Sequence, residues 1–501
     1  MMSSAFPFAP AELQAAAGAA FVAGSLVIYD DAAFWYEAAS AGARLALLAA
    51  PDHPALARFH GEIAAFKDGY LLMRCPAGTE QSQALRATLT WLQPTPLGLG
   101  ASAGFGDRLG LATVGHVRSL QRVLDESPGK TLLPIFAQQS MRENERTRRT
   151  PEDVLNDATW GAFQAGWRGS VGADADHLKS TADVDLCAAA GYSFYTIDPG
   201  AFVDSAADTA APAIIQEKVA ALPWTLLESS PADLARRYVG KVIDLETRQI
   251  MLDEAAVQRA AAKYSRAALH VATLYRHLAS KHIPCELEVS VDETETPTTP
   301  AEHIFIASEL QRLGVQWVSM APRYIGRFEK GIDYIGDLAA LRQDLQTHAE
   351  IARALGPYKL SLHSGSDKFA VYPLISEAAR GMVHLKTAGT SYVEALRVVA
   401  RANPALFREL FAFACAQYPT DRTSYHVSAD VSHAPDARAA PDAALAALLD
   451  DPHARQILHV TFGSMLAQFG APLRETLRAH QADYNDLLDR HFYRHLKPFV
   501  E

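Results

Sequence analysis

Histidine and carboxylate side chains recur at the ends of short apolar segments in the middle of this chain. His177, His363 and His384 each stand near the end of such a segment, and Glu288 lies within another. Imidazole together with carboxylate suits Zn, Mn, Co or Ni, whereas an all-oxygen set would favour Mg or Ca. We therefore predict one divalent metal ion (Zn, Mn, Co or Ni) bound by His177, Glu288, His363 and His384.

The segment "CELEVSVDE" offers several acidic side chains to such a site. Alternation along a strand directs one set of residues to one face and the intervening set to the other. The apolar set, Leu287, Val289 and Val291, suits the side that packs on helices, so the inward set comprises Glu286, Glu288, Ser290 and Asp292. Buried charges are costly unless they are paired or bound to a cation. Which of Glu288, Asp292 and Glu293 completes the metal shell stays open, because a register error of one residue exchanges them.

These residues need elements that bring distant segments together. Short apolar runs with polar ends alternate eight times with helical patterns, at 102–107, 131–139, 171–177, 192–198, 285–293, 315–323, 358–366 and 382–389. Eight strand and helix alternations favour a closed parallel (β/α)8 TIM barrel, whose chemistry gathers at the carboxyl ends of the strands. A doubly wound open sheet is the main alternative.

The rest of the chain divides around this α/β barrel. Residues 1–94 form an Ala-rich pattern with strand-like pieces, which predicts a small N-terminal α/β extension, and 95–400 form the catalytic barrel. Within the barrel, about 200–284 is a mostly helical insertion, which we expect to cover the mouth as a lid. A second wide gap separates Arg323 from Pro357. Residues 401–501 predict a C-terminal helical extension.

Composition narrows the class of protein. The 501 residues are 49% hydrophobic and 21% charged, with 57 acidic against 46 basic residues and a net charge of −11. This charge disfavours nucleic acid and anionic membranes as partners. The one arginine-rich stretch, "RENERTRR", is interpreted as a solvated helix. We expect a cytoplasmic protein without a signal sequence, and a homo-oligomer is compatible with the sequence.

Other motifs give weaker signals. The four cysteines form no CxxC pair, so buried reduced thiols are the default interpretation. The glycine-rich "GLGASAGFG" lacks the context of a dinucleotide site, and we interpret it as loop and strand. His491 and His495 are spaced i, i+4 without a glutamate between them, which a helix surface explains.

Longer stretches carry a resemblance. They are "GFGDRLGLATVGH", "NDATWGAFQAGWR", "GADADHLKS", "YTIDPG", "VDETETPTTPAEHI", "GRFEKGIDYIGD", "LSLHSGSDKFAVYP" and "HLKTAGTSYVEALR", from Gly104 to about Arg397. Together they resemble the tagaturonate epimerase family. Val114 departs from the proline expected in many relatives, which affects loop shape alone. The resemblance implies a metal-dependent sugar epimerase on a barrel fold. Its substrates would be tagaturonate and fructuronate or, as in some relatives, the neutral sugars tagatose and fructose.

A more distant similarity to class II aldolases suggests roles for individual residues. Asp176 and His177 resemble the aldolase pair in which the histidine binds zinc and the aspartate moves a proton. The sixth run ends in Arg323, where such aldolases have another metal-binding histidine, and this difference leaves His384 as the third imidazole.

The reaction implied by the resemblance constrains the mechanism. The inverted carbon is β to the ketone, so its C–H proton is not acidified and enolisation cannot invert it. Retro-aldol cleavage, rotation of the aldehyde and re-addition fit better. Asp176 and either Asp292 or Glu293 would serve as acid and base. Lys179, Arg323 and Lys386 suit a carboxylate or developing negative charge, and the hydroxyl-binding candidates are Gln139, Asp198, Ser366 and Asp367.

Three alternatives stay open. Lys386, inside the barrel, suits a Schiff base with the ketone if it loses its proton. A class II type aldolase would release the two halves instead of rejoining them. A non-catalytic sugar-binding or aldolase accessory protein would need only the hydroxyl-binding residues.

Overall fold

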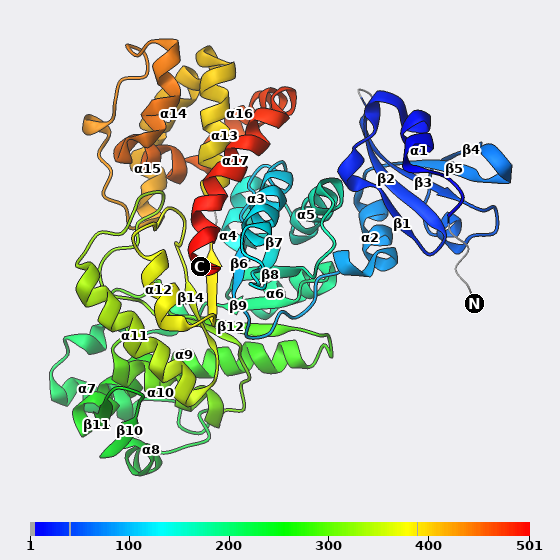
Figure 1. Ribbon diagram of the computed structural model, residues 1–501. Helices are drawn as coiled ribbons and strands as arrows, with labels where there is room; N and C mark the ends of the chain where they lie inside the picture. The colour runs from blue at the N-terminus through cyan, green and yellow to red at the C-terminus, as the bar shows by residue number, and fades with distance from the viewer. Residues whose placement is uncertain (1–5, 40–41, 388) are drawn as a thin grey trace.

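The computed structural model describes residues 6–39, 42–387 and 389–501. Its centre is a closed barrel of eight parallel strands, in the order β12-β13-β14-β15-β6-β7-β8-β9 (Figure 1). The strands are β6 (Ser102–Gly104), β7 (Leu133–Ser140), β8 (Gly172–Leu178), β9 (Phe194–Ile197), β12 (Glu286–Ser290), β13 (Ser319–Ala321), β14 (Lys359–Leu362) and β15 (Val383–Lys386). Six lie within their predicted runs, and β7 and β8 each extend one residue past theirs, so the closed barrel is confirmed and the open sheet is excluded.

Helices surround the barrel. They are α3 (Thr113–Asp125), α4 (Met141–Thr147), α5 (Pro151–Ala165), α6 (Thr181–Ala190), α9 (Glu254–Ala279), α10 (Pro300–Arg312), α11 (Leu338–Leu355), α12 (Tyr372–Ala379) and α13 (Thr390–Ala402). Leu287, Val289 and Val291 are buried in the core. Glu288 and Ser290 face the centre of the barrel, where they contact other polar side chains. Alternation thus separates an apolar outer face from a polar interior along this strand.

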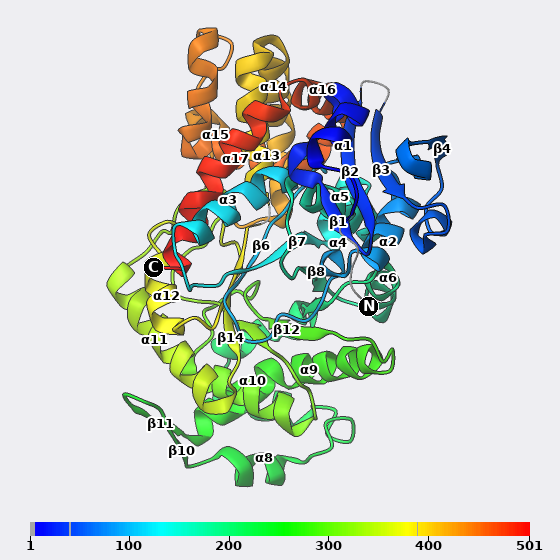
Figure 2. The same ribbon diagram turned by 45° about the vertical axis from the view of Figure 1, so that its right-hand side comes forward.

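The N-terminal module is an antiparallel sheet with two helices. Its strand order is β1-β2-β3-β5-β4, built from β1 (Val27–Tyr29), β2 (Ala32–Ala39), β3 (Gly42–Ala49), β4 (Glu62–Ala65) and β5 (Leu71–Pro76), with α1 (Pro10–Ala17) and α2 (Thr79–Thr88). Helix α2 packs on α5, and the Arg86 guanidinium donates to Asn156 and Thr159 of that helix. The module thus sits beside the barrel (Figures 1 and 2).

The insertion after β9 contains α7 (Pro212–Ala220), α8 (Pro231–Tyr238) and the hairpin β10 (Lys241–Asp244) and β11 (Gln249–Leu252), before the long α9. Its hairpin packs near the end of α11, where Glu350 accepts hydrogen bonds from Thr247. That end of α11 leads into the start of β14, which is the amino-terminal side of the barrel. The hairpin therefore lies at the end of the barrel opposite the mouth and does not cover it, whereas Asp208, near the start of the insertion, accepts from Thr296 in the loop after β12. A covering role of the insertion as a whole stays a prediction.

The C-terminal region is helical, with α14 (Pro404–Asp421), α15 (Pro452–Val460), α16 (Phe462–Ala479) and α17 (Gln481–Leu496). Helix α17 packs along α3 (Figure 1). Gly115 permits this approach, because a Cβ atom there would lie 2.6 Å from the Leu488 Cβ. Within the described ranges, no helix is long and apolar enough to cross a membrane.

Candidate active site

A buried lysine occupies the centre of the barrel. The Lys386 Nζ lies 2.8 Å from Asp174 Oδ2, 2.7 Å from Asp176 Oδ1 and 2.8 Å from Glu288 Oε1. Burial alone would lower the pKa of Lys386, but these three carboxylates raise it well above its ordinary value. The amine therefore stays protonated and has no free lone pair for a Schiff base.

The ammonium of Lys386 can neutralise only one of the three carboxylates that surround it. Burial raises the pKa of Asp174 to about 7, with Lys386 opposing the rise and Asp176 adding to it. The pKa values of Asp176 and Glu288 fall well below their ordinary range because nearby cations outweigh burial. Asp174, which also accepts from Thr196 at 2.9 Å, is thus the group that takes up a proton near neutrality.

His177 is turned into the barrel by an irregularity at the end of β8. The pairing of β8 with β9 shifts register between Ala175 and Leu178, and His177 has a φ of 57°. A bulge of this kind redirects a side chain that regular alternation would place on the outer face. His177 Nδ1 lies 2.7 Å from Asp176 Oδ1, whereas its Nε2 is buried and, among the described residues, has no hydrogen-bond partner.

His363 lies between two carboxylates at the end of β14. Its Nε2 is 2.7 Å from Glu288 Oε1 and its Nδ1 is 2.9 Å from Asp292 Oδ1. Burial would lower the pKa of His363, but Asp292 and Glu288 outweigh burial and raise it to about 10. The two carboxylates therefore favour the protonated form of the ring that lies between them.

His177, Asp292 and His363 form a group whose ligand atoms lie within 4.8 Å of one another. The two imidazole rings are 5.1 Å apart, centroid to centroid. Two imidazoles and a carboxylate suit a divalent transition ion. His177 Nε2 has no hydrogen-bond partner among the described residues and lies 4.0 Å from Glu293 Oε1. Asp176 supports the opposite nitrogen, and a carboxylate behind a metal-binding histidine is the usual support of such a ligand. These residues thus fit the metal expected from the sequence.

The structure does not bring all four predicted ligands together. His384 lies deeper in the barrel, where its Nδ1 is 2.9 Å from Ser102 Oγ and its ring packs on Phe194. Glu288 touches His363, but its oxygens also contact Lys386 and accept from Ser319 Oγ at 2.6 Å. The candidate triplet therefore contains Asp292 in place of His384 and Glu288.

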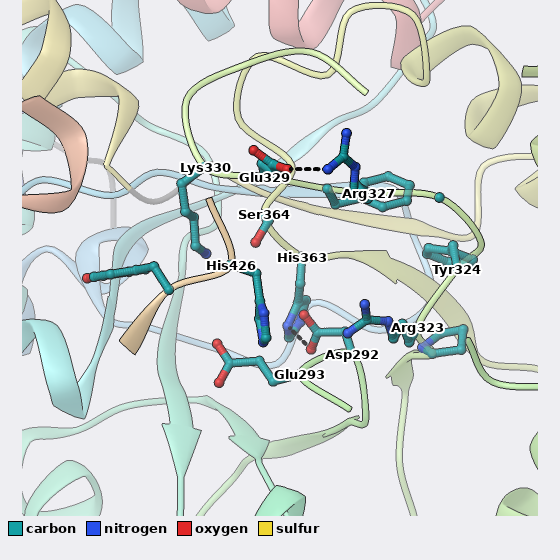
Figure 3. Close-up of a pocket in the computed structure, with 14 residues that line it drawn as sticks. Asp292, Glu293, Arg323, Tyr324, Arg327, Glu329, Lys330, His363, Ser364 and His426 are labelled. Atoms are coloured by element: carbon teal, nitrogen blue, oxygen red, sulfur yellow. Dashed lines mark ion pairs between the residues drawn. The ribbon is translucent and has the colours of Figure 1, made fainter. Parts of the chain in front are cut away.

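A cavity of about 260 Å³ opens above this triplet. Its lining comes from the loops after β12, β13 and β14 and from two residues of the C-terminal region (Figure 3). Asp292, Glu293 and His363 lie on its floor, and Ser364 lies above His363. Glu293 is open to the cavity, with 35% of its side chain exposed. Asp176 contacts His177 Nδ1 and does not line this cavity. Its predicted role in proton transfer stays a prediction.

Sequence reasoning missed several cavity neighbours. Tyr425 and His426 reach the barrel mouth from beyond α14, and Figure 3 shows the His426 ring beside Glu293. Arg142, in the stretch interpreted as a solvated helix, donates to Glu293 Oε1 at 3.2 Å. Glu143 of the same stretch is buried against Arg108. The solvated interpretation is wrong for these two residues.

The predicted substrate-binding residues divide into two groups. Arg323 lines the cavity, and Ser366 lies in the loop after β14. Gln139, by contrast, donates to Thr147 and accepts from Arg149, and Lys179 pairs with Asp198 at 3.1 Å while 61% exposed. None of these last residues lines the cavity.

Asp367 belongs to a separate buried network. Its Oδ1 pairs with Arg455 at 2.9 Å, and its backbone N–H donates to His495 Nε2. His495 Nδ1 donates to the His491 carbonyl, so both ring nitrogens of His495 are in use. The helix-surface interpretation of this pair is wrong, because His495 is fully buried and only 9% of the His491 side chain is exposed.

Comparison with known proteins gives consistent matches. Residues 30–499 match the family model described as tagaturonate epimerase (UxaE). A tagaturonate/fructuronate epimerase from Thermotoga maritima is 43% identical over 432 residues, which cover 86% of this chain and 87% of that protein. The fructuronate-tagaturonate epimerase UxaE from Cohnella laeviribosi, solved natively and with glycerol, has a TM-score of 0.89 and 32% identity, with 98% of each chain covered.

Proposed function

This chain belongs to the tagaturonate epimerase family, and we propose on that premise that it interconverts tagaturonate and fructuronate at the barrel mouth by a metal-dependent retro-aldol route. The observation that carries the proposal is the convergence of His177, Asp292 and His363 below an open cavity. The non-catalytic alternative has no need of such a group. A buried imidazole nitrogen without a hydrogen-bond partner, as found for His177 Nε2 among the described residues, is costly in a protein that only binds sugars.

The metal would be held by His177 Nε2, His363 Nδ1 and Asp292. A divalent ion bound there supplies Lewis acidity for the negative charge that develops on the ketone side of the cleaved sugar. The carboxylates of Asp292 and Glu288, on either side of His363, raise the pKa of this ring, and their negative charge supports the placement of a cation at this point.

Glu293 is the proton-transfer group in this proposal. It lines the cavity and is ionised, because His177, Arg142 and Lys330 outweigh the effect of burial and lower its pKa. It takes the proton of the β-hydroxyl as the bond between the α and β carbons breaks, and returns a proton after the aldehyde has rotated. His426, whose ring lies beside Glu293, is a second group of the cavity wall that could share this transfer.

Lys386 and Asp176 have supporting roles. The Lys386 ammonium offsets three buried carboxylates, so the floor of the site keeps its shape. Asp176 accepts from His177 Nδ1 and thereby fixes the ring with Nε2 directed to the metal position. Arg323 stays a candidate for binding a substrate oxygen.

One experiment tests the function. Metal-loaded protein is incubated separately with tagaturonate, fructuronate, tagatose and fructose, and product stereochemistry is followed by NMR. We expect the two uronates to interconvert without accumulation of free aldehyde. Accumulating aldehyde would indicate a lyase, and no change in any of the four sugars would contradict the proposal.

A further inference from the structure

Lys330 presents an ammonium group to the cavity without a counter-ion. It lies in the loop between β13 and α11, lines the cavity and is half-buried. Figure 3 shows its side chain directed downward into the space above His363. Across the described ranges, no hydrogen bond or ion pair engages its Nζ.

The other cations around the cavity are already engaged. Arg327 pairs with Glu329 at 3.5 Å, and Arg142 pairs with Glu293 at 3.2 Å. The Arg323 guanidinium donates to the Thr294 carbonyl. Among the described lysine and arginine side chains of the cavity wall, Lys330 is therefore the one left for an anionic ligand.

The backbone around Lys330 is held on both sides. The buried Lys368 Nζ donates to the Glu329 carbonyl at 2.7 Å and also to the Ile332 carbonyl. The Arg455 Nε donates to the Gly331 carbonyl at 2.7 Å. Two buried cations thus fix the chain on each side of Lys330, and the side chain that they position is built into the cavity wall.

The neighbouring carboxylate does not neutralise Lys330. Glu329 Oε2 accepts from the Ser428 N–H at 2.9 Å, the Ser428 hydroxyl at 2.7 Å and Gln456 Nε2 at 2.9 Å. These contacts turn Glu329 toward the C-terminal region. The charge of Lys330 is instead felt at Glu293, on the cavity floor.

We propose that Lys330 binds the substrate carboxylate and thereby selects uronates over neutral hexuloses. This assignment rests on the proposed function. In tagaturonate and fructuronate the carboxylate ends the carbon chain on the side of the inverted carbon away from the ketone. A ketone over His177, Asp292 and His363 then leaves the carboxylate for another wall of the cavity, where Lys330 lies.

The choice of lysine suits the reaction. When the bond between the α and β carbons breaks, its electron pair stays on the ketone fragment, the hydroxyl proton passes to the base, and the aldehyde fragment carries the carboxylate. That fragment must rotate before the bond re-forms. An ammonium is a compact charge with three rotatable donors, so it can hold the carboxylate during rotation, whereas an arginine fork fixes an orientation.

The test compares Lys330→Met and Lys330→Arg with wild-type protein on tagaturonate and on tagatose. Lys241→Met, in the exposed β10 strand, is the matched control for loss of one positive charge. Because charge-assisted hydrogen bonds are the strong ones, Lys330→Met should raise KM for tagaturonate about 10- to 100-fold. Lys330→Arg should recover most of this affinity. The KM for tagatose should change less than about threefold, which corresponds to the loss of a weak contact.

The outcomes separate the two proposals. The assignment of Lys330 is overturned if Lys330→Met raises KM by the same factor for both sugars, or if Lys330→Arg binds tagaturonate no better than Lys330→Met. It is also overturned if Arg327→Gln raises KM for tagaturonate selectively and by a larger factor. Wild-type kinetics in Lys330→Met would also overturn it and leave the epimerase proposal intact. Wild-type protein that converts neither uronate would overturn both. Thermal unfolding of each variant verifies that it is folded.

Discussion

His177 Nδ1 lies 2.7 Å from Asp176 Oδ1, although the two residues are adjacent in a strand. Alternation would place them on opposite faces, and the register shift in β8 brings both inside the barrel. The carboxylate fixes the ring so that the opposite nitrogen is free for a metal. This relationship connects the backbone of one strand to the chemistry of the site.

Asp176→Asn should weaken metal binding by about 10- to 100-fold, because supporting carboxylates of metal-binding histidines have effects of this size. The measurement is a competitive titration with a chromogenic chelator. Asp174→Asn is the control, since Asp174 contacts Lys386 and not His177. Equal losses in the two variants would contradict a specific role of Asp176.

Lys386→Met should destabilise the protein by about 3 to 5 kcal/mol, because it leaves buried carboxylates without their cation. Denaturant unfolding measures this loss, and adding Asp174→Asn should recover part of it. The Schiff-base alternative makes a different prediction, namely that borohydride reduction with substrate traps a covalent adduct on Lys386. We expect no adduct.

Glu293→Gln should lower kcat about 10²- to 10⁴-fold, the range for loss of a general acid or base. Metal content should stay at the wild-type level, since Glu293 is not one of the three clustered ligands. Steady-state kinetics and metal analysis of the same preparation test both points. If the Glu293→Gln variant keeps its activity, another group must transfer the proton.

Acid should destabilise the fold through His116. Burial lowers the pKa of this ring to about 4, against an ordinary 6.5, and it lies between Phe105 and Phe492. Below pH 6.5 His116 becomes protonated in the unfolded chain but stays neutral in the folded protein. The free energy of unfolding therefore falls as the pH is lowered to about 4, by about 3 kcal/mol in total.

Urea unfolding from pH 7 to pH 4.5 should therefore show a shallower slope in His116→Leu than in wild type. The exposed His433 provides the control, and His433→Gln should keep the wild-type slope. Identical slopes in His116→Leu and wild type would show that His116 is not the group that titrates.

The sequence predicted the barrel well because its signals are local. Eight apolar runs with polar ends became eight strands, and alternation in "CELEVSVDE" placed Glu288 inward. Alternation also would have found Asp174, two residues before Asp176. It could not find the position of His177, because a bulge depends on how two strands pair.

Contacts between segments far apart in the sequence were the other feature that could not be predicted. Tyr425 and His426 follow α14 and carry no motif, so only the packing of the C-terminal region shows that they reach the mouth. Asp367, predicted to bind a substrate hydroxyl, pairs with Arg455 and does not line the cavity. The wide gap after Arg323 was visible in the spacing of the strands, but nothing local indicated that Lys330 within it faces the site.

Metal dependence is the central claim, and metal stoichiometry measured together with turnover tests it most directly. Chelator-dialysed protein should be inactive on tagaturonate, and one equivalent of Zn, Mn, Co or Ni per chain should restore activity. His177→Ala and His363→Ala should each lose stoichiometric binding by elemental analysis. Full turnover by metal-free protein, or unchanged metal affinity in both variants, would contradict the account.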